Sequence, residues 1–469
     1  MSRRVFITSE YESIMNSCGK DEREIASGRK KVALICPTMW DDAELPGVLA
    51  TTGYEVMPYG TDVSEHPDGF DALSFIDNAV AALRMAGLHG VMASDDYPGS
   101  ILAAAIAQRL GLPGPGSGKV LLCQHKYYSR LAQRAAVPEA VPSFALVRGD
   151  GGAEQPQIPM PAFVKPVKSF FSILAQRVDT PDELRRLAKA ARPHLHSFVK
   201  PFNVLLQRFT DFPVNGSHLI AERVLDGAQV TVECCMYRGE FMLVGITDSV
   251  MYPGTISFAR FEYPSRLGET VQRKMSAIAG RCALAIGLDN CLFNVEMFYN
   301  EKAKTVHIIE INPRMCPQFA DMMEKVNGVN TYEIALAIAS GVRPVTTRKG
   351  ARYRAAVSYV PRLFEDRLVR QVPDQTEIDD LLLRFPDARF KLLCAAGRRL
   401  SSELQDGKSY RYALLNMGGE SRADAVVRCE VALRGLTFRF DDPVQSQSAR
   451  AISAANRELT EPDPTTMSG

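Results

Sequence analysis

The sequence lacks the features that mark secreted, zinc-binding and membrane proteins. Its ten cysteines include no CxxC pair and no cysteine–histidine spacing of a zinc site, and most lie in apolar segments. No apolar run approaches the roughly 18 residues of a membrane span, and the N-terminal segment has no secretory signal. The net charge of +1 provides no global attraction for nucleic acid or anionic lipid. These absences favour a cytoplasmic protein that binds neither nucleic acid nor membranes.

The length of 469 residues predicts several domains rather than one. Near the N-terminus, short apolar strands alternate with helical segments. Strands are expected at 31–37, 54–58 and 89–94, and helices at 77–85 and 101–110. This alternation predicts a parallel sheet with crossover helices.

The most informative stretch is FNVEMFYNEKAKTVHIIEINPR, residues 293–314, which predicts a β-hairpin with a polar turn. Side chains alternate along a strand, so residues on one face can be assigned. Asn294, Glu296 and Phe298 share a face of the first strand, and Val306, Ile308, Glu310 and Asn312 share a face of the second. With Asn300 opposite Val306, Glu296 lies directly across from Glu310.

Facing carboxylates destabilise a sheet unless a cation lies between them. Glu296, Glu310 and the amide oxygen of Asn312 together make a hard-oxygen site suited to Mg²⁺. Taken alone, the same pattern also fits the solvated face of a structural hairpin. The rest of the chain must decide between the two interpretations.

Three features upstream fit a nucleoside triphosphate. Lys165 lies on the apolar strand FVKP, where an ammonium is costly to bury without an anion, and Lys126 opens a predicted helix. Each lysine alone also fits a surface position. At Glu222 a strand ends and bends, with Val224 and Leu225 able to pack on a flat heterocycle, although an ordinary β-turn has the same pattern.

In this order the features resemble the ATP-grasp family, over roughly residues 30–345. The matching positions are Lys126, Lys165 with the KSFFS segment at 168–172, Glu222, Glu296, Glu310 and Asn312. The EINPR ending with its upstream acid is the most specific part of the match. The resemblance implies an ATP-grasp fold of α/β and α+β parts, in which two α+β lobes enclose ATP.

The same resemblance implies a division into segments. A polar extension (1–29) precedes a Rossmann-like α/β domain (30–118), the small lobe with its lid (119–222), the large lobe with the metal site (223–344), a C-terminal α+β region (345–440) and a polar tail that we expect to be disordered (441–469).

Two positions differ from the family pattern. The phosphate-covering loop is usually glycine-rich, but this one contains no glycine, so Lys168, Ser169 and Ser172 are the candidates to replace its backbone contacts. Gln229 stands where the family has a ribose-binding glutamate, and an amide accepts a hydroxyl proton without a charge.

The resemblance implies an ATP-dependent carboxylate–amine ligase. Such an enzyme activates a small-molecule carboxylate, here with amino acids among the expected acids, as an acyl phosphate, joins it to a small-molecule amine, and releases ADP and phosphate. Glu296, Glu310 and Asn312 would hold two Mg²⁺ ions, with Mn²⁺ as the alternative metal. Arg314 would grip the substrate carboxylate, and Arg260 is a further candidate on the acceptor side. Relatives of this type are often homodimers.

Two other functions fit the same residues. A carboxylase that makes carboxyphosphate from bicarbonate, for biotin or for a purine precursor, would use the same ATP site, although no biotin-accepting module is recognisable. A non-catalytic ATP-binding regulatory protein would keep the fold, but the intact set of two acids and an asparagine argues against this function.

Overall fold

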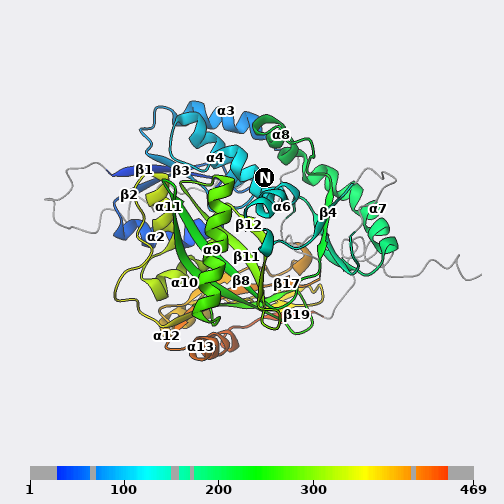
Figure 1. Ribbon diagram of the computed structural model, residues 1–469. Helices are drawn as coiled ribbons and strands as arrows, with labels where there is room; N and C mark the ends of the chain where they lie inside the picture. The colour runs from blue at the N-terminus through cyan, green and yellow to red at the C-terminus, as the bar shows by residue number, and fades with distance from the viewer. Residues whose placement is uncertain (1–28, 64–69, 149–157, 170–173, 403–407, 442–469) are drawn as a thin grey trace, which may run out of the picture.

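The computed structural model describes residues 29–63, 70–148, 158–169, 174–402 and 408–441. Within them the chain forms a three-stranded, a four-stranded and an eight-stranded sheet, together with two two-stranded pairs (Figure 1). This architecture confirms the predicted fold class of α/β and α+β parts. No helix among the described residues has both the length and the apolar character needed to cross a membrane.

The three-stranded sheet is parallel, with the order β2-β1-β3. Its strands are β1 (Lys30–Ile35), β2 (Tyr54–Tyr59) and β3 (Gly90–Met92), accompanied by helices α2 (Met39–Thr51), α3 (Ala72–Leu83) and α4 (Gly99–Leu110). The last four residues of β1 are buried, as expected for a strand of a parallel sheet that is covered on both faces. The predicted alternation of strands and helices is therefore confirmed.

The four-stranded sheet is antiparallel, with the order β4-β7-β5-β6. Its strands are β4 (Phe144–Val147), β5 (Ala162–Pro166), β6 (Gln176–Val178) and β7 (Leu219–Arg223). Helices α5 (Ser117–Gln124) and α6 (Lys126–Ala136) precede it in the chain, and α7 (Pro181–Phe198) and α8 (Lys200–Phe209) connect β6 to β7. Lys165 and Glu222 lie on its two central strands, β5 and β7.

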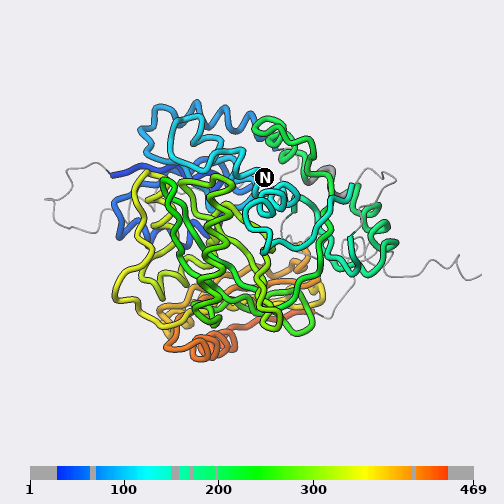
Figure 2. Tube along the Cα trace, viewed as in Figure 1, coloured from blue at the N-terminus to red at the C-terminus, as the bar shows by residue number. Residues whose placement is uncertain are grey.

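The eight-stranded sheet has the order β12-β11-β8-β9-β10-β13-β18-β16. Its strands are β8 (Ala228–Tyr237), β9 (Glu240–Met251), β10 (Phe258–Tyr263), β11 (Cys291–Asn300), β12 (Thr305–Asn312), β13 (Ala355–Tyr359), β16 (Arg389–Leu392) and β18 (Ala413–Gly419). The C-terminal part of the chain thus extends the sheet, and Figure 2 shows it in yellow and orange beside the green strands.

The remaining elements surround this sheet. They are helices α9 (Glu269–Ile286), α10 (Pro317–Asn327), α11 (Thr331–Ala339), α12 (Gln375–Arg384) and α13 (Arg422–Arg434), 3₁₀ turns at Pro138–Ala140 and Leu400–Ser402, and the strand pairs β14 (Arg362–Leu363) with β17 (Tyr410–Arg411) and β15 (Val369–Gln371) with β19 (Arg439–Phe440). Helix α9 begins and ends at the predicted residues, and Gly287 ends it in the left-handed conformation, with φ 75°.

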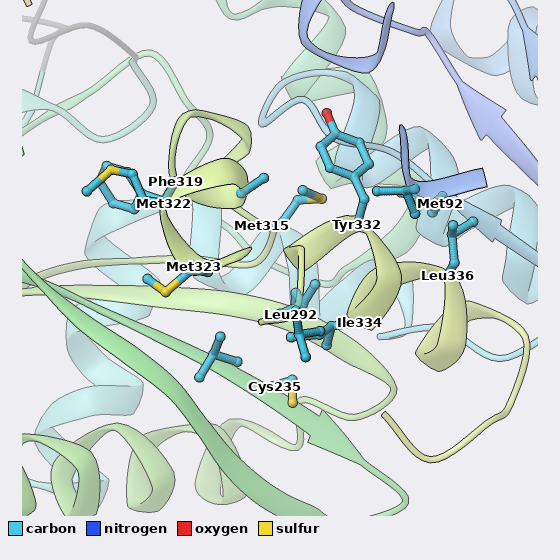
Figure 3. Close-up of a cluster of buried hydrophobic side chains, with 14 of the residues drawn as sticks. Met92, Cys235, Leu292, Met315, Phe319, Met322, Met323, Tyr332, Ile334 and Leu336 are labelled. Atoms are coloured by element: carbon cyan, nitrogen blue, oxygen red, sulfur yellow. The ribbon is translucent and has the colours of Figure 1, made fainter. Parts of the chain in front are cut away.

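The two faces of the large sheet differ in chemistry. On one face, Cys234 of β8 and Phe293 of β11 are buried in a core with α9. On the other face, Cys235 and Leu292 pack in a second core with Tyr332 of α11 (Figure 3). Because side chains alternate, this second face continues along β8 and β11 as a row of polar residues beyond the apolar core. These polar residues form the floor of the site described below.

The β11–β12 hairpin has the predicted register at its acidic end but not at its turn. Glu296 is paired with Glu310, as predicted. Asn300, however, is paired with Thr305 and not with Val306, so this part of the prediction is wrong. The register shifts by one residue directly after Glu296.

The cause is a bulge at Ile309, the extra residue on β12 between the partners of Glu296 and Met297. A one-residue shift reverses which face the following side chains occupy. Val306 and Ile308 therefore lie in the core with α9, whereas Glu310 and Asn312 line a cavity. The prediction that all four share one face is wrong for this reason.

Candidate active site

The site is a cavity of about 1180 Å³ between the three sheets. It lies at the carboxyl ends of the parallel strands, where ligands of open α/β sheets bind. Twelve of the fourteen predicted site residues line it: Lys126, Lys165, Lys168, Ser169, Glu222, Val224, Leu225, Gln229, Glu296, Glu310, Asn312 and Arg314. Residues far apart in the sequence thus meet as predicted.

Two predicted residues are not among these. Arg260 lies on β10, where its Nε is 2.7 Å from Oε1 of the buried Glu262, and it does not line the cavity. Ser172 lies outside the described residues.

The acidic end of the hairpin forms one side of the cavity. The amide nitrogen of Asn312 donates to Glu296 Oε1 at 3.3 Å, and that of Gln229 donates to Glu296 Oε2 at 3.2 Å. Across the pair, Lys126 Nζ lies 3.1 Å from Glu310 Oε2. Glu310 therefore faces the first residue of helix α6.

The charges of the two acids are not equivalent. Burial and the negative charge of Glu310 raise the pKa of Glu296 above its usual range. Burial acts in the same direction on Glu310, but Lys126 and Lys165 lower the pKa of that carboxyl. A divalent cation between the acids would remove their repulsion, and the donor set of two carboxylates and one amide oxygen fits Mg²⁺.

A buried ion cluster connects α6 and the four-stranded sheet to β12. Arg130 of α6 donates to both oxygens of Glu222, at 2.6 and 3.2 Å, and to the carbonyl oxygen of Ile309 at 2.7 Å. Lys165 Nζ lies 3.1 Å from Glu222 Oε2 and 3.4 Å from the same Ile309 oxygen. The bulge thus turns a backbone carbonyl toward two cations.

This cluster sets the charge of the adjoining cavity wall. Burial would raise the pKa of Glu222, but Arg130 and Lys165 bring it to about 2. Burial lowers the pKa of Lys165, and Glu222 partly opposes that effect. Two cations balanced by one carboxylate leave a positive charge beside the cavity, as a site for an anionic ligand requires.

Lys168 and Ser169 follow β5 and also line the cavity. The backbone oxygen of Ser169 accepts a hydrogen bond from Lys126 Nζ at 3.3 Å. The Lys168 ammonium is buried and lies 4.4 Å from the centre of the Tyr97 ring, and burial lowers its pKa to about 8. Its proposed contact with phosphate stays a prediction.

Comparison with known proteins finds a family match for the central part of the chain. Residues 158–323 match the ATP-grasp domain family. The chain contains an ATP-grasp domain. The crystal structure of L-amino acid ligase from Bacillus licheniformis superposes with a TM-score of 0.70 at 16% identity, covering 89% of this chain and 100% of that one. Biotin carboxylase from Campylobacter jejuni superposes with a TM-score of 0.59 at 14% identity, covering 92% and 96%.

Among curated proteins, carnosine synthase 1 from Homo sapiens is 26% identical over 269 residues, which are 54% of this chain and 31% of that protein. The chain spans less than a third of the length of the curated relatives that it matches. At these identities the structural likeness shows the fold alone.

Three further residues in or beside the cavity were not predicted. Arg130 lies four residues after Lys126 and hence on the same helix face, a spacing that could have revealed it. Asp96 follows β3, where the carboxyl end of a parallel strand is a signal for a binding residue. Glu233 shares a strand face with Gln229, and burial raises its pKa to about 8.

Arg314 and Asp96 both line the cavity and lie close to each other. Arg314 Nε lies 4.0 Å from Asp96 Oδ1, too far for a hydrogen bond. The side chain of Gln124 donates to the Asp96 backbone oxygen at 2.8 Å, while its own oxygen, also buried, has no hydrogen-bond partner among the described residues. The Arg314 guanidinium and the Asp96 carboxylate thus both line the cavity without a hydrogen bond between them.

Proposed function

We propose that this protein is an ATP-dependent carboxylate–amine ligase that activates its acid as an acyl phosphate. One observation supports this proposal above all others: the facing acids Glu296 and Glu310 share a cavity with Lys126, Lys165 and Arg314. Such a cavity offers a metal site, phosphate-binding cations and a carboxylate-binding arginine in one space. No protein nucleophile is needed for this chemistry.

The nucleotide would lie between the two lobes. Lys126 and Lys165 would offset the charge of the phosphates. Val224 and Leu225, which line the cavity directly after β7, would pack on the base, and Gln229 would accept a hydrogen bond from the ribose. Ser169 and Lys168 are the described candidates for further phosphate contacts.

Glu296, Glu310 and Asn312 would hold magnesium, and we propose two ions. Bound Mg²⁺ would neutralise the β- and γ-phosphates and template the in-line attack on phosphorus. The hairpin acids would then no longer repel each other. Asn312 would present its side-chain oxygen to the metal while its amide nitrogen stays hydrogen-bonded within the sheet.

For the acid substrate we propose an amino acid. Arg314 would bind its carboxylate, and Asp96, 4.0 Å away, would bind its ammonium. An α-amino acid has one carbon between these two charges, so both can reach adjacent partners at once. Burial and the charge of Asp96 raise the pKa of Asp95 to about 7, and an incoming ammonium would relieve the repulsion between these acids.

The reaction proceeds in two balanced steps. A carboxylate oxygen attacks the γ-phosphorus, the bond to the bridging oxygen breaks, and ADP leaves with that electron pair. The amine, as its neutral form, then attacks the acyl carbon; phosphate leaves with the electrons of the C–O bond, and the amine loses a proton. Arg314 would stabilise the negative charge on the acyl oxygen during the second step.

A screen of acids and amines tests the proposal. Purified protein with Mg·ATP should release ADP only when the correct acid and amine are both present, with an amide product visible by mass spectrometry. Release of AMP would contradict the acyl-phosphate route. Turnover that depends on bicarbonate would favour the carboxylase function, for which the biotin carboxylase fold is the supporting likeness. Nucleotide binding without any turnover would favour a regulatory protein.

A further inference from the structure

Asn294 is a buried asparagine beside the proposed metal ligands, and neither the motif nor the proposed reaction accounts for it. It is 1% exposed. It lies on β11, paired with Asn312 of β12 on one side and with Glu233 of β8 on the other. Directly paired residues of adjacent strands share a face, so these three side chains form one row, and Asn312 of this row lines the cavity.

Within this row Asn312 is the donor and Asn294 is the acceptor. The amide nitrogen of Asn312 donates to Asn294 Oδ1 at 3.0 Å, and to Glu296 Oε1 at 3.3 Å. When the nitrogen of an amide is held inside the sheet, its oxygen must point the other way. Because Glu296 would itself turn to a bound cation, Asn294 is the acceptor that can hold the Asn312 nitrogen in the loaded site.

We propose that Asn294 is a positioning residue, which orients the amide of Asn312 so that its oxygen faces the metal. The inference rests on the proposed magnesium site. Residues that orient a metal ligand through its second polar atom typically change metal affinity by about 10- to 100-fold. Asn294 accepts this hydrogen bond as a neutral group. A carboxylate in its place would accept it as well, and its added negative charge would not oppose the binding of a cation.

The variants Asn294→Leu and Asn294→Asp separate the two roles of this side chain. Leucine keeps the volume but removes the acceptor, so the Asn312 amide can rotate and present its nitrogen to the cation. Aspartate keeps an acceptor oxygen at the same place. As a control, Asn327→Leu removes another buried amide, which hydrogen-bonds to Val244 and Tyr263 in the apolar core.

The measurement is ADP affinity by calorimetry across a Mn²⁺ titration, with EDTA as the metal-free reference. We expect Asn294→Leu to bind ADP like the wild type in EDTA but to need about 10- to 100-fold more Mn²⁺ for the metal-dependent gain. Asn294→Asp should need no more Mn²⁺ than the wild type, and Asn327→Leu should keep the wild-type Mn²⁺ dependence.

Three results would overturn the inference: an unchanged Mn²⁺ dependence in Asn294→Leu, an equal loss in Asn294→Asp, or an equal loss in the Asn327→Leu control. If the wild type itself gains no ADP affinity from Mn²⁺ or Mg²⁺, the proposed function fails together with the inference. A wild type that responds to metal while Asn294→Leu responds equally refutes the inference alone. Thermal unfolding of each variant identifies any loss of fold.

Discussion

Glu296 and Glu310 face each other at paired positions of β11 and β12, with Lys126 on one side of the pair and the Gln229 amide on the other. A sheet that places two half-buried acids opposite each other is stabilised by a cation between them. This relationship connects the hairpin to the ATP site.

The substitution Glu310→Gln tests the hairpin directly. It removes one charge without changing the shape of the side chain. Loss of a residue that only hydrogen-bonds to a metal ligand typically lowers activity by roughly 10- to 100-fold, and loss of a ligand itself should lower turnover by more than this. ADP should bind no better with Mg²⁺ than with EDTA. Steady-state kinetics and calorimetry measure both effects. Wild-type turnover in a folded Glu310→Gln protein would remove the hairpin from the mechanism.

Arg130→Met should destabilise the protein. The variant leaves Glu222 with Lys165 alone and removes a donor to the Ile309 carbonyl, in a region closed to water. Breaking a buried pair by removing one partner typically costs about 3–5 kcal/mol. Urea unfolding measures the loss. The exposed Arg134→Met, on the same helix, is the control, and equal stability of the two variants would contradict the structural role of Arg130.

Arg314→Lys should affect the acid and not the nucleotide. Lysine keeps the charge but loses the planar fork that binds a carboxylate and an oxyanion. We expect kcat to fall roughly 100-fold or more, with unchanged ADP affinity. Arg260→Lys, outside the cavity, should keep near-normal kinetics. If Arg260→Lys lowers kcat and Arg314→Lys does not, then Arg260 and not Arg314 binds the substrate carboxylate.

The pH dependence of stability should include a contribution from His125. This ring is fully buried before Lys126, with Nε2 3.2 Å from the Asn215 oxygen, and burial lowers its pKa to about 4. The unfolded chain takes up this proton below about pH 6.5, whereas the folded chain resists until about pH 4. Stability from this group is therefore fully present above pH 6.5 and is lost as the pH falls toward 4.

Over that window the loss amounts to about 3 kcal/mol. Urea unfolding of the wild type and of His125→Phe between pH 7 and pH 4 isolates it, because other groups contribute equally to both proteins. The wild type should lose more stability than the variant. Parallel pH profiles would show that His125 does not titrate in this way.

The acidic motif could be predicted because strand alternation is a local rule. The spacing placed Glu310 and Asn312 on one face. Glu296 was also predicted opposite Glu310, although the assumed pairing of Asn300 with Val306 was wrong and the bulge restores the acidic pair. The bulge at Ile309 could not be found in this way. It depends on the core under α9, which takes Val306 and Ile308, and on the two cations that bind the Ile309 carbonyl.

Contacts between residues far apart in the sequence could not be predicted either, because they also depend on tertiary packing. Arg130 and Glu222 are 92 positions apart, and their pairing depends on how α6 packs against the small-lobe sheet. Asp96 follows a strand of the three-stranded sheet and Arg314 follows a strand of the eight-stranded sheet, so only the packing of these two sheets brings them together. Arg260, by contrast, lies outside the cavity beside Glu262, a partner two residues away on the same strand face that strand alternation could have revealed. The limits of the domains stay a prediction.

The central claim is that the cavity activates a carboxylate by phosphorylation. The most direct measurement uses an acid, found by the screen, that is labelled with ¹⁸O in both carboxylate oxygens. If an acyl phosphate forms, one ¹⁸O must pass from the acid into the released phosphate, and ³¹P spectroscopy should show singly labelled phosphate in proportion to product. Unlabelled phosphate, or label recovered in AMP, would contradict the account.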